Sequence, residues 1–265
     1  MGSLDHLIGI LKGLGSAVVA FSGGVDSTFL LKAVKMSGIE ALAVTSVSPS
    51  HPEWDVKTAR DMTSEIGIAH RLIETHELEN SGYSENSRQR CYYCKSELFA
   101  ALSEIAQKEG FHHVIDGSTA DDLNDYRPGM KAASRYGIKS PLLEAGLGKK
   151  EIRNFSRQLG LDTWDRPSSP CLASRVPYGT PITIEGLRKI AQSEIALRRL
   201  GLREFRVRDH GDVARVEVSG PDFETALTAK KEIVAALREH FRFVCLDLEG
   251  FRSGSMNRVI DEKGE

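Results

Sequence analysis

The sequence predicts an α/β fold, in which a parallel sheet covered by helices on both faces is followed by a smaller C-terminal α+β domain. Two observations predict the sheet. Apolar runs alternate with helical patterns through the first half of the chain, and runs such as residues 17–21 (AVVAF) are apolar without interruption, as in strands buried on both faces. A third observation separates the domains, because prolines and glycines gather just after Trp164.

The elements of the first domain follow in chain order. The N-terminal 15 residues form an amphipathic helix, in which Asp5 and His6 stand where a signal peptide would carry basic residues. Strands are expected at residues 16–22, 41–48, 71–75 and 113–117, with a short fifth at 139–143. Helices are expected at residues 26–35, 52–66 and 94–108.

The rest of the chain divides at a proline-rich linker. Residues 1–165 form the first domain, 166–181 the linker and 182–265 the second domain, which we expect to bind substrate or to mediate oligomerisation. In the second domain helices are expected at residues 183–200 and 222–240, and strands at 204–208, 214–218 and 243–248.

Composition excludes several classes of protein. A formal net charge of −2 argues against nucleic acid as the main partner, since nucleic-acid-binding domains are usually strongly basic. No run approaches the ~18 apolar residues that a membrane span needs. Four cysteines in 265 residues are too few for a disulfide scaffold, so a reducing cytoplasm is expected.

The segment SGGVDS lies between the first expected strand and its helix. Gly23 and Gly24 can adopt backbone angles closed to other residues, so their N–H groups can converge on an anion. Asp26 or Ser27 can cap the helix, whose N-terminus carries partial positive charge. The segment therefore predicts a phosphate cradle beginning at Ser22. The alternative is a strand–turn–helix corner without a ligand.

The SGGVDS segment resembles the signature of the PP-loop ATP pyrophosphatases, and no GxxxxGK[ST] motif is present. The resemblance implies that ATP is cleaved between its α and β phosphates, with Mg²⁺, and that an oxygen of the substrate is adenylated. Asp26 is then expected to take part in catalysis. Ser46 and Gly117, near the ends of the second and fourth strands, are assigned to nucleotide binding.

A second acidic motif, DGSTADDLNDYRPG, follows the fourth strand from Asp116. Asp121, Asp122 and Asp125 are candidates to hold Mg²⁺ or orient a ribose, and Arg127 to meet a phosphate. A solvated acidic turn that caps a helix is an equally good interpretation of any one of these aspartates.

Four blocks resemble a narrower family, the LarE-type sulfur transferases, also called pyridinium-3,5-biscarboxylic acid mononucleotide sulfurtransferases. The blocks are DDLNDYRPG at 121–129, CLASRVPYGT at 171–180, FRVRDHGDVARVEV at 205–218 and GFRSGSMN at 250–257. The resemblance implies adenylation of a carboxylate of that mononucleotide and then sulfur transfer, which gives a thiocarboxylate for a nickel-pincer nucleotide cofactor. It also implies a homo-oligomer, plausibly a hexamer.

The cysteines predict sulfur or metal chemistry. Cys91 and Cys94 open a helix, where backbone N–H groups lower a thiol pKa, and Cys171 lies in the linker. Three thiolates leave one iron of a four-iron, four-sulfur cluster open for an extra sulfide. Zinc completed by His51 or His76 is the alternative, as is a pair of plain reduced thiols.

The resemblance bears on this choice. Some LarE-like proteins sacrifice the sulfur of one cysteine, whereas others carry three cysteines and are understood to hold a cluster; this chain has the three-cysteine pattern. Cys245, in the apolar run FVCLDL, is expected to be an inert core residue.

Arginines in the second domain predict a phosphate pocket. Arg206 and Arg208 alternate on a strand and share one face, and Arg252 follows a glycine. With Ser174 and Arg175 they can surround a phosphate, because guanidinium forks match its oxygens. A solvated strand face is the alternative for any one arginine. The family resemblance implies that three residues grip the substrate phosphate, with two glutamates lining the site: Ser174, Arg206 and Arg208, then Glu194 and Glu217.

Two other functions stay open. The chain resembles tRNA thiolases and ammonia-dependent ligases of the same superfamily, although an RNA-binding appendage is not evident and ammonia ligases need no cysteines. An adenine-nucleotide sensor without turnover is the third hypothesis.

Overall fold

The protein was analysed as a computed structural model that describes residues 3–124, 128–252 and 254–257. The chain forms two compact units. The first unit comprises Met1–Tyr83 and Gln89–Ser169, and the second comprises Ser84–Arg88 and Pro170–Glu265. The chain thus enters the second unit twice, and the later entry falls inside the expected linker.

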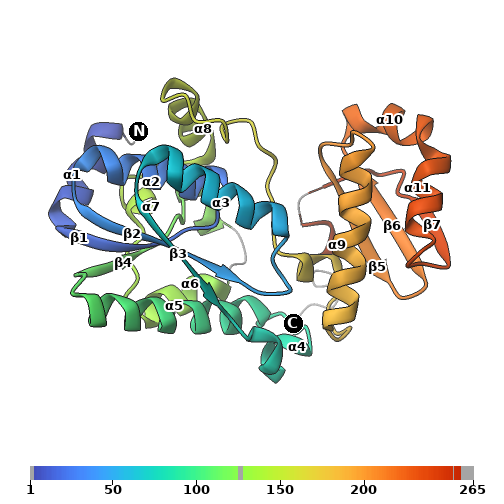
Figure 1. The fold of residues 1–265 in the computed structure, drawn as a ribbon, viewed down its shortest axis with the longest axis horizontal. Helices are drawn as coiled ribbons and strands as arrows, with labels where there is room; N and C mark the ends of the chain where they lie inside the picture. Colours follow the sequence, from blue (N-terminus) through green and yellow to red (C-terminus); the bar gives the residue numbers. More distant parts are fainter. Residues whose placement is uncertain (1–2, 125–127, 253, 258–265) are drawn as a thin grey trace. The chain divides into compact units, whose positions relative to one another are not determined.

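The first unit is built on a parallel sheet, which confirms the α/β class (Figure 1). Within the described residues its strand order is β3-β2-β1-β4. The strands are β1 (Ser16–Ala20), β2 (Glu40–Val47), β3 (Ala69–Glu74) and β4 (His113–Ile115). The expected fifth strand is wrong, because only a single bridge joins Ile115 to Lys139 and Pro141, which has no N–H to donate, begins helix α7 (Pro141–Glu144).

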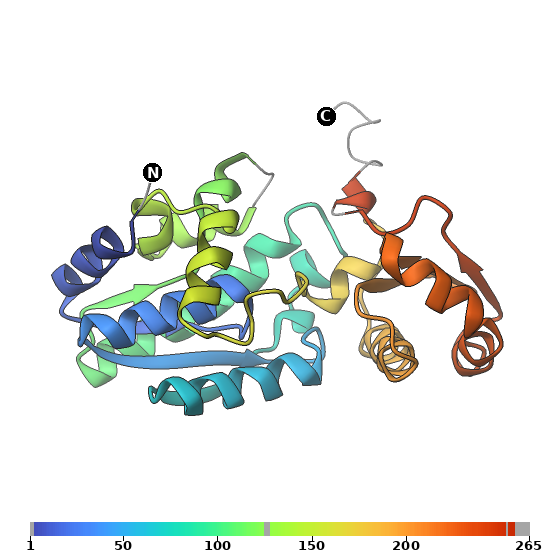
Figure 2. The same ribbon diagram turned by 90° about the horizontal axis from the view of Figure 1, so that it is seen from above.

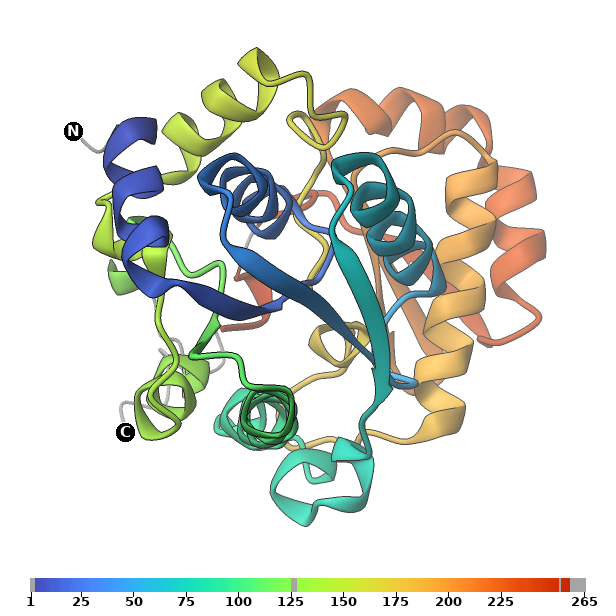
Figure 3. The ribbon, with the colours of Figure 1, turned by 60° about the vertical axis from the view of Figure 1, so that its left-hand side comes forward.

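Helices cover both faces of this sheet (Figure 3). One face packs on α1 (Leu4–Leu14), α2 (Val25–Ser37), α3 (Glu53–Ile66) and α8 (Lys149–Gln158). The other packs on α5 (Arg90–Glu109) and α6 (Pro128–Arg135). Successive residues of β1 serve the two cores in turn, since Ala17 and Val19 face the first and Val18 the second.

Short helical turns join these elements at the carboxyl ends of the strands. They are η1 (Glu77–Glu79), α4 (Ser81–Ser84) and η2 (Ala120–Asn124). In the described residues no helix is long and apolar enough to cross a membrane.

The second unit has a small sheet of strand order β5-β6-β7, whose strands are labelled in Figure 1. Figure 2 shows the same ribbon turned by 90° about the horizontal axis. Its strands are β5 (Phe205–His210), β6 (Val213–Val218) and β7 (Phe243–Leu246). Strand β6 pairs antiparallel with β5 and parallel with β7. The helical elements are η3 (Leu172–Arg175), α9 (Ile184–Arg199), η4 (Gly220–Asp222), α10 (Phe223–Thr228), α11 (Lys230–Leu237) and η5 (Ser255–Asn257). The helix expected at 222–240 is therefore interrupted, with Ala229 between its two parts.

The two faces of the small sheet differ in polarity. Apolar residues of β5 and β6, such as Val207 and Val216, pack on α9, α10 and α11. The alternate residues, Arg206, Arg208 and Glu217, are buried on the opposite face. Cys245 is exposed on β7, so the expectation of a core cysteine is wrong: Val244 and Leu246 pack against the apolar cluster, and the alternation turns Cys245, which pairs with Arg215, to the other face.

A short strap ties the second unit together. Asn86, fully buried and with a φ of 57°, donates to three carbonyl oxygens of the Cys171 segment: Val176 at 3.3 Å, Pro177 at 2.7 Å and Thr180 at 2.9 Å. The backbone N–H of Ile182 also donates to the carbonyl of Ser84. Residues 84–88 thus act as a brace for a segment some 90 residues away.

Candidate functional site

The SGGVDS segment forms the turn between β1 and α2. The hydroxyl oxygens of Ser22 and Ser27 lie 3.1 Å apart, and Ser27 donates to the carbonyl of Gly24 at 3.2 Å. The hydroxyl of Ser22 is exposed and accepts the N–H of Gly24 at 3.4 Å. The N–H groups of the first turn of α2 lack partners within the helix and carry partial positive charge. This corner is a ready site for a phosphate.

Two glycines permit the close packing of this corner. Gly23 has a φ of 70°, and a Cβ there would lie 3.0 Å from the backbone nitrogen of Ala59 on α3. A Cβ on Gly117, just after β4, would lie 3.3 Å from the backbone nitrogen of Ser27. The structure thus brings Gly117 to the SGGVDS corner. Ser46 lies half-buried on the neighbouring strand β2.

Arg166 braces the corner from the segment expected to be a linker. Its Nη1 donates to the carbonyl of Gly23 at 3.2 Å, and its Nη2 to Asp55 at 2.9 Å. The hydroxyl of Ser169 donates to the other oxygen of Asp55 at 2.7 Å. Sequence reasoning missed the ion pair between Arg166 and Asp55, because neither of these two residues belongs to a recognisable motif.

The carboxylates of Asp121 and Asp122, in the acidic motif after β4, accept hydrogen bonds from backbone N–H groups. Asp121 accepts the N–H of Lys149 at the start of α8, and Asp122 accepts the N–H of Thr119 at 2.9 Å. These contacts brace the loop, as the helix-capping interpretation expects, and a role in nucleotide binding remains a prediction. Asp125 and Arg127 lie outside the described residues.

A polar cluster at the carboxyl ends of β2 and β3 was not predicted. The carboxylate of Glu77, 1% exposed, accepts the hydroxyls of Ser48 and Ser50, both at 2.5 Å. The oxygen of Ser48 also lies 3.0 Å from Nδ1 of His51. Because Ser48 gives its one proton to Glu77, Nδ1 of His51 must donate, which leaves Nε2 as an acceptor.

Burial lowers the pKa of His51, and Lys95 lowers it further, while Glu77 and Asp55 oppose this shift. Neutral His51 is thus favoured near pH 7. A serine-rich loop and one glutamate carry no motif, so the sequence alone gave no signal for this cluster.

The three candidate cysteines are divided between the two units, with Cys91 and Cys94 in the first and Cys171 in the second. Cys91 is exposed and Cys94 half-buried, and they stand one turn apart at the start of α5. Cys171 lies in the second unit, at the residue that precedes η3. The convergence of all three thiols remains a prediction. Within the described residues, no group of three or more His, Cys, Asp or Glu side chains is arranged to hold a metal ion.

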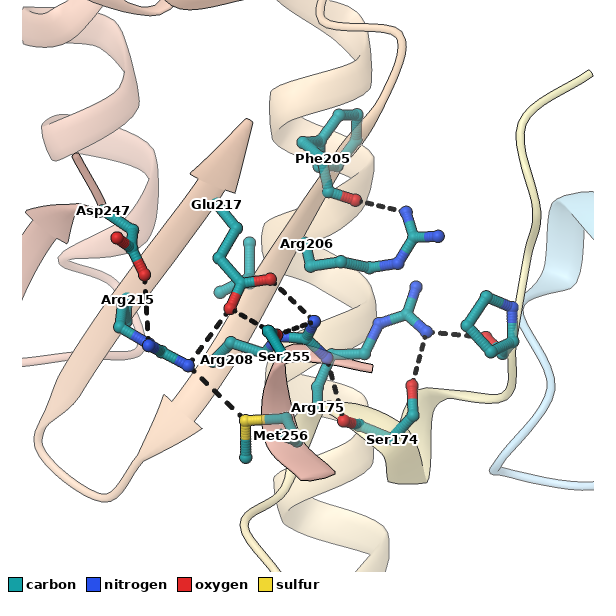
Figure 4. A network of polar contacts seen from close by, with 12 residues as sticks. Ser174, Arg175, Phe205, Arg206, Arg208, Arg215, Glu217, Asp247, Ser255 and Met256 are labelled. Carbon is teal, nitrogen blue, oxygen red and sulfur yellow. Dashed lines mark hydrogen bonds and ion pairs between the residues drawn. The ribbon is translucent and has the colours of Figure 1, made fainter. Parts of the chain in front are cut away.

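The polar face of the small sheet is an ionic network (Figure 4). Glu217, fully buried, lies 2.6 Å from Nη2 of Arg208 and 3.1 Å from Nη2 of Arg215. Nη1 of Arg215 lies 3.1 Å from Asp247. Arg208 also donates to the carbonyl of Ser174 at 2.9 Å, and the hydroxyl of Ser255 donates to Glu217 at 3.0 Å.

Arg206 lies on the same face, 5% exposed, with its guanidinium 4.6 Å from the centre of the Phe251 ring. Burial, with the like charges of Arg175 and Arg208, lowers the pKa of Arg206 to about 10, against the opposing effect of Glu194. A bound anion would relieve this cost, because it would favour the charged guanidinium. Arg206 and Arg208 therefore share one face of β5, and Arg208 reaches the carbonyl of Ser174 on η3. That these residues bind a phosphate remains a prediction.

Arg175 lies next to this face, since its Nη1 lies 3.0 Å from the hydroxyl of Ser174. It is 1% exposed, and its Nε and Nη2 donate to the two oxygens of Glu194, each at 2.8 Å. Glu194 also accepts the N–H of Val207 at 3.1 Å. Both oxygens of Glu194 are thus engaged within the protein. Arg252 is exposed.

Comparisons with known proteins extend over almost the whole chain. No protein-family model matches. An uncharacterized protein of Synechocystis sp. is 43% identical over 97% of both chains. The pyridinium-3,5-bisthiocarboxylic acid mononucleotide synthase of Lactiplantibacillus plantarum is 36% identical over 96% of this chain and 93% of its own.

A solved structure resembles part of this fold. The NMN synthetase from Francisella tularensis superposes with a TM-score of 0.51 and 18% identity, over 63% of this chain and 74% of that one. At this identity the likeness supports the fold only.

Proposed function

We propose that this chain, which belongs to the LarE-type family of ATP-dependent sulfur transferases in the PP-loop superfamily, converts a carboxylate of pyridinium-3,5-biscarboxylic acid mononucleotide to a thiocarboxylate. The observation that carries the proposal is a buried arginine face: Arg206 and Arg208 are buried in the second unit, where Arg208 contacts Ser174, whereas the SGGVDS corner belongs to the first unit. A chain that acts on ATP and on a separate phosphorylated substrate needs both sites.

The first step is adenylation. A carboxylate oxygen of the substrate attacks the α-phosphorus of ATP, the bond to the β-phosphate oxygen breaks, and pyrophosphate leaves. The N-terminus of α2, with the hydroxyls of Ser22 and Ser27, would hold the leaving pyrophosphate. Mg²⁺, which commonly uses one or two carboxylates together with phosphate oxygens, would neutralise charge beside Asp26. Ser46, Gly117, Asp121 and Asp122 are the other proposed nucleotide residues.

The second step forms the carbon–sulfur bond. A sulfur nucleophile attacks the acyl carbon, and AMP leaves with the oxygen that was adenylated. Cys91, Cys94 and Cys171 are the proposed sulfur residues. Cys91 and Cys94, one turn apart at the open start of a helix, suit two thiolate ligands of an iron–sulfur cluster. Such a cluster, held by the three thiolates, would supply a replaceable sulfide.

The arginine face would orient the substrate. Ser174, Arg206 and Arg208 would bind the mononucleotide phosphate, with exposed Arg252 near the end of the described chain as a further candidate. Glu217 would hold Arg208 in place, and Glu194 would act through Arg175. Two rounds of reaction would give the bisthiocarboxylate that precedes a nickel-pincer cofactor, in a homo-oligomer within the cytoplasm.

Anaerobically purified protein tests this proposal. ATP, Mg²⁺, a sulfide source and the pyridinium mononucleotide should yield AMP, pyrophosphate and a product whose mass reflects replacement of oxygen by sulfur. Formation of AMP only when tRNA or ammonia replaces the mononucleotide and sulfide would instead identify another reaction of the superfamily. Nucleotide binding without AMP under every condition would identify a sensor. Iron and sulfide analysis of the same sample tests the cluster, which should be lost in Cys91→Ser.

A further inference from the structure

We infer that Arg175 is a positioning residue, which fixes the backbone on both sides of Cys171 and links it to the phosphate-binding arginines, with Glu194 as its anchor. The inference rests on the proposed function in assigning sulfur chemistry to Cys171 and phosphate binding to Arg206 and Arg208. Every contact that carries it lies within the second unit.

Arg175 donates hydrogen bonds to the two backbone carbonyls on either side of the Cys171 Cα atom. Its Nη1 donates to the carbonyl of Pro170 at 2.6 Å and to that of Cys171 at 3.1 Å. These oxygens belong to the peptide groups before and after Cys171, so holding both restricts the φ and ψ of Cys171, which are −55° and 153°. The direction of its Cα–Cβ bond is restricted with them.

The other side of the guanidinium is anchored to regular structure. Glu194 on α9 accepts from Nε and Nη2 of Arg175, and the same carboxylate accepts the N–H of Val207 on β5. A bidentate arginine–carboxylate pair fixes the plane of the guanidinium as well as its position. The Cys171 loop is therefore held by a helix and a strand through one planar group.

The same atom connects the cysteine loop to the anion site. Nη1 of Arg175 lies 3.0 Å from the hydroxyl of Ser174, whose carbonyl accepts from Arg208 at 2.9 Å. Arg208 is in turn fixed by Glu217. The spacing between the substrate phosphate and the Cys171 backbone is thus set within one hydrogen-bonded network. Positioning of a reacting group at this level changes rates strongly.

A purely structural ion pair would stabilise the fold without affecting Cys171. Arg175→Lys separates the two roles, because lysine keeps the charge but lacks the planar fork. The rate of Cys171 alkylation by iodoacetamide, measured on the full chain with Cys91, Cys94 and Cys245 replaced by serine, reports the loop without needing any substrate. Release of the loop should raise this rate about fivefold.

Glu194→Gln is the second variant, for use also where Arg175→Lys does not fold, and should raise the alkylation rate in the same direction. The double variant should add little, because the two residues act as one unit. Asp222→Asn is the matched control: Asp222 is a buried carboxylate of the same unit that accepts the backbone N–H groups of Arg203 and Glu204, and these contacts do not involve the Cys171 loop.

The outcomes separate this inference from the proposed function. Faster alkylation in Arg175→Lys or Glu194→Gln, but not in Asp222→Asn, supports positioning, and in proteins that retain all cysteines it should accompany lost thiocarboxylate with retained pyrophosphate release. An unchanged rate in a folded variant, or an equal rise in the Asp222→Asn control, overturns it. Failure of the wild-type protein to form AMP would contradict the proposed function and leave the alkylation result standing.

Discussion

Gly23 is the residue on which the shape of the phosphate corner depends. Its φ of 70° disfavours a side chain, and a Cβ there would press on the backbone of α3 at 3.0 Å. Gly24, by contrast, has an ordinary φ of −75° as the N-cap of α2. The two adjacent glycines therefore have different roles: Gly23 permits the turn, whereas Gly24 starts the helix.

Gly23→Ala should abolish pyrophosphate release and lower the free energy of unfolding by about 1–3 kcal/mol, because backbone strain and a close contact act together. Urea unfolding and a pyrophosphate assay measure the two effects. Gly9→Ala, in a helical position with nothing within 4 Å of the new Cβ, is the control and should be neutral or stabilising. Retained pyrophosphate release in Gly23→Ala would show that the turn is not needed for ATP cleavage.

His51 gives the stability a pH dependence of predictable sign. Burial lowers its pKa in the folded protein, so the unfolded chain binds its proton more readily. Stability should fall as the pH decreases below about 6.5, the ordinary histidine pKa, by up to about 1.4 kcal/mol per pH unit from this group. The slope should be shallower in His51→Asn, whose amide can replace the Nδ1 donor. Equal slopes between pH 5 and 7 in urea unfolding would contradict this assignment.

At the scale of the element, the small sheet illustrates what alternation does and does not reveal. The sequence correctly indicated that Arg206 and Arg208 share a face. It could not show that the face is buried, or that Glu217 and Arg215 on β6 stand directly opposite in the register. Cross-strand pairing depends on register, which the pattern of a single strand does not encode.

Arg206→Met tests this face as an anion site. Removal of a buried cation that is held at a lowered pKa should leave unfolding free energy unchanged or raised in the absence of a ligand. The increase in melting temperature that inorganic phosphate gives the wild-type protein should disappear. If phosphate stabilises the variant as much as the wild type, the anion binds elsewhere.

At the scale of the whole molecule, most strands and helices could be predicted to within a few residues, because both faces of the first sheet are buried and its strands are continuously apolar. The errors have physical causes. Pro141 begins a helix where a strand was expected. Cys245 is exposed because it alternates with Val244 and Leu246, which pack against the apolar cluster. Glu77 and Arg166 were not predicted as site residues, because their partners lie far away in the sequence: Ser48 and Ser50 for Glu77, and Gly23 and Asp55 for Arg166. Asp121 lies in η2 and accepts the N–H of Lys149 at the start of α8, and its expected role in nucleotide binding stays a prediction.

The strap formed by residues 84–88 is the feature of the architecture least visible in the sequence. Asn86→Ala should lower the stability of the second unit by about 1–3 kcal/mol, since three carbonyls lose their donor, the one of Val176 in a buried contact and the other two in part-buried contacts. Asn86→Gly removes the same hydrogen bonds but accommodates the φ of 57°. It should therefore be slightly less destabilised than the alanine variant in urea unfolding. Wild-type stability in both variants would contradict the role of the strap.

This interleaving of the chain affects how the protein can be divided for study. A gene fragment that begins at Pro170 would encode every strand of the small sheet and still omit the donor that Val176, Pro177 and Thr180 require. Expressed alone, such a fragment should be soluble only if the missing peptide is supplied, either fused ahead of it or added in trans. The gain in stability on adding a synthetic Ser84–Arg88 peptide would then measure how much this segment, which lies in the sequence between two stretches of the first unit, contributes to the folding of the second unit.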